Sequence, residues 1–293
     1  MPSRIKYLPE YLLLYLFTRI IYILPFDFSV KIGRALGRLV YRLDKRHRRI
    51  ALENIASTLG LNGPEAEKIV LSVFENLGMV LAEFIKIPTI DKSFLDKRVS
   101  VEGFENYLKA KSEGKGVLML GAHLGNWELL GATLLLKMGE VASVVYMKTK
   151  NPYVDRFIDS IRKSYGIKTI PHHNAMKPVL TALRRGEAVG VLLDQHGGQK
   201  EAIKVTFIGR PAATSIGFAI MALRTGAPVV PMFMVREGDG RFRFIYEKPI
   251  YLEKSGDLEK DIRDGTIIFN KVIEDYVRRY PEQWFWVHRR WKE

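Results

Sequence analysis

The spacing of hydrophobic residues along this chain changes near residue 100. Before that point, hydrophobic residues recur at the three- and four-residue intervals of amphipathic helices, as in residues 30–43 and 65–85. After it, short apolar and often β-branched runs alternate with helical patterns. We expect strands at residues 117–120, 144–147, 189–193, 229–235 and 242–247. We expect helices at residues 127–137, 153–165, 176–185, 215–224 and 267–279, the last preceded by a charged connection at 254–264.

This alternation favours an α/β fold with a largely parallel or mixed central sheet flanked by helices. The pattern divides the chain into three segments. Residues 1–26 are expected to form a membrane-associating N-terminal helix, residues 27–98 a helical basic region, and residues 99–293 the α/β core. Residues 27–293 are expected to form one compact unit.

The N-terminal apolar block is irregular for a membrane span. It is interrupted by Arg19 and closed by Pro25, whereas a spanning helix needs about 20 consecutive apolar residues. Three interpretations stay open: a buried amphipathic helix, an interfacial helix, and a short tilted anchor. The tyrosine-rich apolar face and the cationic cluster at residues 45–49 favour an anionic membrane surface. A cleavable signal peptide is not expected, because no small-residue cleavage site follows.

The charge balance points to polyanionic partners. The chain has 46 Lys and Arg against 32 Asp and Glu, a net charge of +14. Nucleic acid, anionic lipid headgroups and phosphorylated glycolipids all suit that sign. The absence of cysteine excludes disulfides, thiolate metal sites and cysteine nucleophiles. His172 and His173 lack a third ligand at suitable spacing, so neither a metal nor another cofactor is expected.

The most informative segment follows the predicted strand at 117–120. In a continuous helix, His123 and Glu128 would point about 140° apart. Gly125 permits a bend between them, and Asn126 is a favourable helix N-cap. Glu128 then falls in the first helical turn, where its carboxylate can return to the imidazole. We expect Glu128 to orient His123, whose other ring nitrogen acts as a general base.

A base without a neighbouring serine or cysteine nucleophile indicates direct activation of a substrate hydroxyl, which attacks a carbonyl without an acyl-enzyme. The backbone N–H groups of Gly125 and Asn126, and the Arg162 guanidinium, are candidate oxyanion donors. Asp194 and Gln195 follow another predicted strand. Because α/β sheets carry their sites at the carboxyl ends of strands, both are expected near the active site.

Several ordered segments resemble one known family. The segment His123-Leu-Gly-Asn-Trp-Glu128 resembles the HxxxxD/E motif of the lipid A biosynthesis acyltransferases, the late or secondary acyltransferases of lipopolysaccharide assembly. The resemblance covers nearly the whole chain. It includes Lys150-Asn-Pro152, Arg162, Asp194-Gln195, Arg224-Thr-Gly-Ala-Pro-Val-Val-Pro231 and Pro281-Glu-Gln-Trp-Phe-Trp-Val-His-Arg-Arg290.

This resemblance implies a glycerolipid acyltransferase-like fold and an O-acyltransferase on the cytoplasmic face of the inner membrane. His123 would be the general base with Glu128 as its partner, the donor an acyl thioester on acyl carrier protein, and the acceptor a lipid A precursor. The family often has an arginine near the strand end where this chain has Met147 and Lys148, so Lys148 is a candidate anion contact.

Three alternatives accompany this interpretation. An acyltransferase for another glycolipid, such as phosphatidylinositol mannoside, shares the reaction and a related motif. A nucleic-acid-binding protein would use the positive charge and the aromatic, cationic residues 284–291, although that segment also suits a membrane-interface belt or core packing. A noncatalytic membrane scaffold would tolerate loss of His123. We expect no nucleic-acid partner, because the charge clusters beside lipid-directed features.

Overall fold

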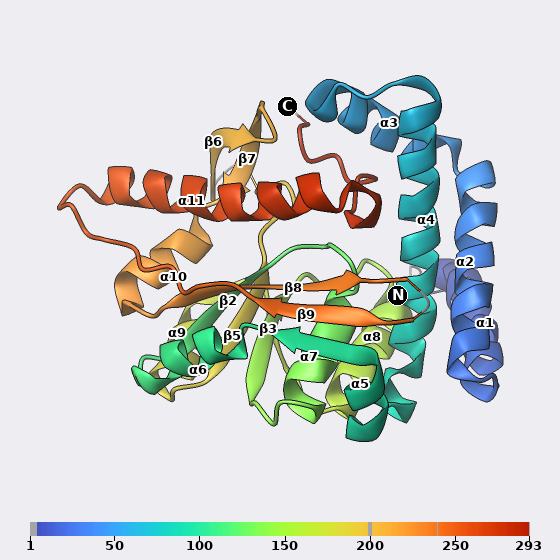
Figure 1. The fold of residues 1–293 in the computed structure, drawn as a ribbon, viewed down its shortest axis with the longest axis horizontal. Coiled ribbons are helices and arrows are strands. Elements are labelled where there is room, and N and C mark those ends of the chain that lie inside the picture. Colours follow the sequence, from blue (N-terminus) through green and yellow to red (C-terminus); the bar gives the residue numbers. More distant parts are fainter. Residues whose placement is uncertain (1–4, 199–200, 239, 293) are drawn as a thin grey trace.

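The computed structural model describes residues 5–198, 201–238 and 240–292. A seven-stranded sheet forms its centre (Figure 1), and its strands lie in the order β1-β9-β8-β2-β5-β3-β4. The strands are β1 (Val99–Glu102), β2 (Val117–Gly121), β3 (Ala142–Tyr146), β4 (Lys168–Pro171), β5 (Ala188–Leu192), β8 (Val229–Arg236) and β9 (Phe242–Tyr246). All neighbours in this sheet pair in parallel except β8 and β9. The predicted α/β fold with a mostly parallel sheet is confirmed.

Helices cover both faces of the sheet. Along β2, Leu118 and Leu120 belong to one hydrophobic cluster, and Val117 and Met119 to another. The first cluster includes side chains of α9, α10 and α11, the second side chains of α6, α7 and α8. Because β2 is buried on both faces, its sequence is continuously apolar rather than alternating. In Figure 1, α11 lies above the sheet and α5, α6 and α7 lie below it.

The helices are α1 (Leu8–Ile23), α2 (Phe26–Leu43), α3 (Lys45–Leu59), α4 (Gly63–Lys86), α5 (Lys92–Arg98), α6 (Phe104–Ser112), α7 (Trp127–Leu136), α8 (Pro152–Ser164), α9 (Met176–Arg184), α10 (Gly217–Thr225) and α11 (Leu258–Arg279). The described residues also form the short 3-10 turns η1 (Ile5–Tyr7), η2 (Ile87–Thr89) and η3 (Pro281–Gln283). A separate antiparallel hairpin joins β6 (Ala202–Phe207) to β7 (Arg210–Ser215).

The predicted charged connection at 254–264 is wrong from Leu258 onward, because α11 begins there. Asp257 caps this helix through its side chain, which accepts a hydrogen bond from the Lys260 N–H. The charged residues of its first turns lie largely on the exposed side. The apolar spacing typical of a helix therefore becomes clear only several residues after the helix begins. The hairpin of β6 and β7 was not predicted either.

The N-terminal helices pack beside the sheet. Helices α2 and α4 meet where Gly33 and Gly37 of α2 contact α4 near Gly78, and a Cβ at any of these glycines would overlap the facing backbone. Helix α4 also contacts the turn after β2, where the Asn76 side chain donates to the Gly125 carbonyl at 3.1 Å. Helix α1 leaves much of its apolar surface exposed, including Leu13 and Leu16. Among the described residues, no helix combines the length and hydropathy required to cross a membrane.

Candidate active site

His123 lies in a sharp turn at the carboxyl end of β2. Gly125 has a positive φ of 62°, and a Cβ there would overlap the Met234 carbonyl oxygen. Asn126 caps α7, since its side-chain oxygen accepts a hydrogen bond from the Leu129 N–H at 2.9 Å. The predicted glycine bend and asparagine cap are therefore confirmed.

The partner of His123 differs from the prediction. Nδ1 of His123 lies 2.8 Å from Oδ1 of Asp194, and the His123 backbone N–H donates to Oδ2 of the same carboxylate at 3.0 Å. Asp194 follows β5, the immediate neighbour of β2, and is 2% exposed. Burial raises the pKa of Asp194, but the His123 charge and the hydrogen bonds that the carboxylate accepts outweigh burial and hold the pKa below its ordinary value. Asp194 therefore orients His123 and remains ionised.

Glu128 binds a different side chain. Arg162 of α8 donates from Nε to Oε2 of Glu128 at 3.2 Å and from Nη2 to Oε1 at 2.5 Å. Glu128 is thus held by Arg162, while Nδ1 of His123 is held by Asp194, so the predicted contact between Glu128 and His123 is wrong. Burial lowers the pKa of Arg162, whereas the neighbouring Glu128 charge raises it, with a net rise. Arg162 also lines the cavity, and its predicted role as an oxyanion donor stays a prediction.

The proposed backbone oxyanion donors are also already engaged. The Gly125 N–H donates to the Gln283 carbonyl at 3.0 Å, and the Asn126 N–H donates to the Met234 carbonyl at 2.9 Å. Neither group is available to a substrate, because the turn is itself held by these backbone hydrogen bonds. Gln195 is placed differently: its Nε2 lies 3.4 Å from Nε2 of His123. A side-chain amide thus lies beside Nε2 of His123.

A large cavity opens beside His123. Its volume is about 930 Å³, and its lining includes Trp127, Glu128, Arg162 and Gln195. A narrow apolar pocket of about 60 Å³ adjoins it between α7 and the sheet and shares Trp127, Glu128 and Arg162 with it. The combination suits a ligand with one polar end and one apolar chain.

Lys148 does not join this site. Met147 and Thr149 line the cavity, but Lys148 between them is exposed and is not part of the cavity wall. Successive side chains of an extended segment point to opposite sides, which explains the alternation. His172 and His173 lie at the cavity, yet within the described ranges no cluster of three or more metal-ligating side chains occurs.

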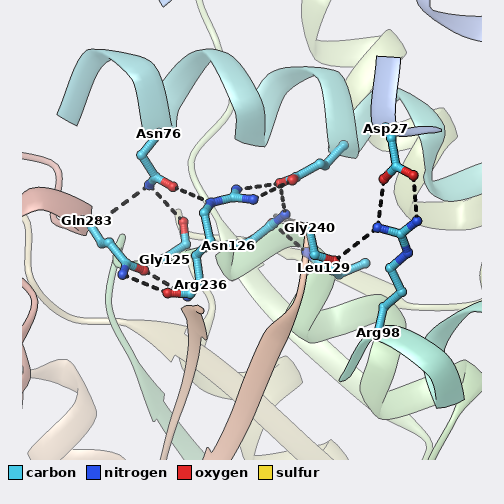
Figure 2. Close-up of polar contacts among 10 residues, drawn as sticks. Asp27, Asn76, Arg98, Gly125, Asn126, Leu129, Arg236, Gly240 and Gln283 are labelled. Atoms are coloured by element: carbon cyan, nitrogen blue, oxygen red, sulfur yellow. Dashed lines mark hydrogen bonds and ion pairs between the residues drawn. The ribbon is translucent and has the colours of Figure 1, made fainter. Parts of the chain in front are cut away.

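A buried ionic network supports the turn that carries His123. Glu83 of α4 receives the Asn126 amide at 2.6 Å and two Arg236 N–H groups at 2.6 and 2.7 Å. Arg236 also donates to Asn76 at 3.1 Å, and Asn76 donates to the Gly125 carbonyl at 3.1 Å. Figure 2 shows Asn76, Gly125, Asn126 and Arg236 converging in this way. The turn is thus tied to α4 and to the end of β8.

The aromatic C-terminal segment contributes a residue that the sequence reasoning missed. Trp284, Trp286 and Trp291 are all buried, and so is Arg290. Core packing is therefore the correct interpretation of this segment, and a membrane belt or nucleic-acid surface made by these side chains is wrong. The Trp284 indole donates from Nε1 to Oδ2 of Asp194 at 2.8 Å. The only signal in the sequence was the aromatic tail itself, which does not name its partner.

The fold and the site together define an α/β protein in which a histidine, held by a buried carboxylate, faces a large, partly apolar cavity. A family model described as bacterial lipid A biosynthesis acyltransferase matches residues 3–293. The chain belongs to this family and is therefore an acyltransferase.

Individual relatives agree with this assignment. The lipid A biosynthesis lauroyltransferase of Escherichia coli is 29% identical over 92% of this chain and 87% of its own. The lipid A biosynthesis palmitoleoyltransferase of the same organism is 27% identical over 92% of this chain and 86% of its own. The phosphatidylinositol mannoside acyltransferase of Mycobacterium tuberculosis is 27% identical over 82% of this chain and 75% of its own. Among solved structures, a 1-acyl-sn-glycerophosphate acyltransferase of Thermotoga maritima aligns with a TM-score of 0.37 at 12% identity, covering 85% of this chain and 96% of that chain.

Proposed function

We propose that this protein transfers a fatty acyl chain from acyl carrier protein to a hydroxyl group of a lipid A precursor, with His123 as the general base. The observation that carries the proposal is the arrangement of His123. Its Nδ1 is held by the buried Asp194, while the ring lines the cavity. In this arrangement Nε2 is left for a substrate proton.

The geometry supports a simple sequence of steps. Nε2 of His123 accepts the proton of the acceptor hydroxyl as its oxygen attacks the thioester carbon. The tetrahedral intermediate then collapses, the carbon–sulfur bond breaks, and His123 returns the proton to the leaving thiolate. Asp194 stabilises the imidazolium between these steps, as a carboxylate does in hydrolase triads. The Gln195 amide, next to Nε2, is the side chain best placed to donate to the developing oxyanion.

The remaining site features suit a lipid substrate. The pocket between α7 and the sheet is mostly apolar and adjoins the wall that carries Glu128 and Arg162. We propose that the ion pair of these two residues supports the wall between the large cavity and this apolar pocket. Its side chains are only 14% and 15% exposed, so removing one partner would leave a largely buried charge.

We also propose that the protein acts at the cytoplasmic face of the inner membrane. The outer surface of α1 exposes a row of apolar side chains, with Leu13 72% and Leu16 60% accessible. Lys45, Arg46 and Arg49 at the start of α3 are exposed cations. An apolar helix combined with a basic cluster is the two-signal pattern that holds a protein on anionic lipid. An interfacial placement of α1 requires no membrane-spanning length.

A purified-protein assay tests the reaction. The full chain is incubated with acyl carrier protein thioester and a lipid A precursor in mixed micelles, and products are identified by mass spectrometry. His123→Ala is expected to lower turnover by roughly 10²- to 10⁴-fold, the typical contribution of a general base. His47→Ala, on α3 and outside the cavity, is the matched control. Full activity in His123→Ala would refute His123 as the general base, whereas no product with the wild-type chain would favour a noncatalytic scaffold.

A second acceptor enters the same assay because one relative is a phosphatidylinositol mannoside acyltransferase. If product forms with phosphatidylinositol mannoside but not with the lipid A precursor, the proposed acceptor is wrong, whereas the proposed role of His123 as general base is unaffected. Nucleic-acid binding is the competing class. It predicts an affinity for nucleic acid that falls steeply with salt and is unchanged in His123→Ala. Two features supported this class, the positive charge and the aromatic C-terminal segment, and the second no longer does because its tryptophans are buried.

A further inference from the structure

The C-terminal segment after α11 runs directly alongside the catalytic turn. The Gln283 carbonyl accepts the Gly125 N–H at 3.0 Å, and the Phe285 N–H donates to the His123 carbonyl at 3.1 Å. Two backbone hydrogen bonds therefore hold both ends of the short stretch that carries the histidine. The tail is part of the framework of the site, even though it is the last segment of the chain.

Between these two backbone contacts, Trp284 turns its indole ring toward Asp194. The Asp194 carboxylate accepts three hydrogen bonds: from Nδ1 of His123 at 2.8 Å, from the His123 backbone N–H at 3.0 Å and from Nε1 of Trp284 at 2.8 Å. Both Asp194 and Trp284 are 2% exposed. A carboxylate with so little contact with water depends on protein donors for its ionised form. Trp284 is the one donor among these three that does not come from the base itself.

We propose that Trp284 is a positioning residue of the reaction: its indole N–H fixes the Asp194 carboxylate and limits how readily the His123–Asp194 pair takes up a proton. This inference rests on the proposed role of His123 as general base. The indole bond stabilises the ionised carboxylate, which opposes protonation of the carboxylate. It also draws negative charge away from Oδ1, which weakens the hold of Asp194 on an imidazolium. Removing the bond favours the protonated pair through both effects.

Other charged groups face the pair and must stay constant in the test. Arg290 and His288 of the same tail lie within electrostatic range of Asp194, and His196 lies within electrostatic range of His288. The Glu128 and Arg162 ion pair stands on the cavity wall. None of these groups hydrogen-bonds to the Trp284 indole in the described part of the chain, so a change confined to the indole nitrogen leaves their charges in place.

The tail provides its own matched control. Trp286 is also fully buried, and its indole N–H donates to the Pro281 carbonyl at 2.7 Å. The same chemical change at position 286 removes a partly buried hydrogen bond of similar length from the same segment. It does so without touching Asp194. Effects on packing are thus shared by both positions, whereas effects on the pair are specific to position 284.

The test replaces the indole N–H by sulfur through site-specific incorporation of β-(3-benzothienyl)alanine, which keeps the ring shape, at position 284 or 286 of the full chain. Trp284→Phe and Trp286→Phe form a second matched pair. The acid limb of the pH profile of kcat/KM is expected to move upward by about one unit in both 284 variants, the effect of one hydrogen bond to a charged group. It should not move in either 286 variant.

A second measurement does not depend on activity. The His123 imidazole is titrated by ¹⁵N chemical shift in labelled protein, with His123→Ala identifying its signals. The midpoint is expected to rise by about one unit with the sulfur analogue at 284 and to stay at the wild-type value with the analogue at 286. An unchanged midpoint, a downward shift, or equal shifts at both positions would overturn the inference. Failure of the proposed function is distinguished from failure of this inference: full activity of His123→Ala would refute the role of His123 as general base, whatever the midpoint of its titration.

Discussion

Replacing Arg236 by methionine should destabilise this protein far more than an ordinary arginine substitution. The guanidinium makes two hydrogen bonds to Glu83 and one to Asn76. The Glu83 side chain is 0% exposed and that of Arg236 is 7% exposed. Arg236→Met would leave the buried Glu83 carboxylate with the Asn126 amide as its remaining donor in the network. Breaking a buried ion pair from one side costs about 3 to 5 kcal/mol, and we expect the free energy of unfolding to fall by that amount.

The control is a two-pronged ion pair near the surface, also drawn in Figure 2. Arg98 contacts both oxygens of Asp27, at 2.7 and 2.8 Å, but the Asp27 side chain is 62% exposed. Arg98→Met leaves a carboxylate that water can solvate, so it should lower the free energy of unfolding by about 1 kcal/mol or less. The two variants make the same substitution in pairs of similar geometry and different burial.

Urea unfolding in detergent, followed by circular dichroism and tryptophan fluorescence, measures both variants. The double variant Glu83→Gln with Arg236→Met removes the uncompensated charge while keeping an oxygen for the Asn126 amide. It should therefore be more stable than Arg236→Met alone. Equal losses for Arg236→Met and Arg98→Met, or a double variant no better than Arg236→Met, would refute the reasoning that burial sets the importance of this network.

Three further predictions follow from the described contacts. Gly125→Ala should abolish acyl transfer, measured by product mass spectrometry, because its Cβ would overlap the Met234 carbonyl and its φ of 62° is strained for alanine; normal turnover would contradict this. Burial lowers the pKa of His288 from 6.5 to about 4, so this histidine is protonated at a lower pH in the folded chain than in the unfolded chain. The free energy of unfolding should therefore decrease as the pH falls from 6.5 to about 4. That slope, measured by urea unfolding, should flatten in His288→Phe, and an unchanged slope would assign it to other groups. The double variant Leu13→Asp with Leu16→Asp should lower the affinity for anionic vesicles, measured by co-sedimentation, by about tenfold or more, since two exposed apolar side chains of α1 are lost. Unchanged affinity would exclude α1 from the membrane contact.

Much of the local structure could be predicted from the sequence. The strand at 117–121 is read from its apolar run, because a central parallel strand is buried on both faces. Gly125 and Asn126 mark the turn that follows, since positive φ and helix capping are demands on single residues and their close neighbours. The sequence pattern does not reveal the start of α11, because the first turns of this helix carry few apolar residues and so lack a clear helical spacing.

The sequence by itself therefore determined the alternation of strands and helices, the sharp turn after β2, the presence of His123 in that turn, and the family to which the chain belongs. Only the tertiary structure decided which carboxylate orients His123. Asp194 stands 71 residues away in the chain and meets the histidine because β5 lies beside β2. Glu128, close in sequence, is instead taken by Arg162 of α8. Periodicity and capping are set by neighbours along the chain, whereas the partner of a charged side chain depends on which strand ends and helices the fold brings together at one edge of the sheet.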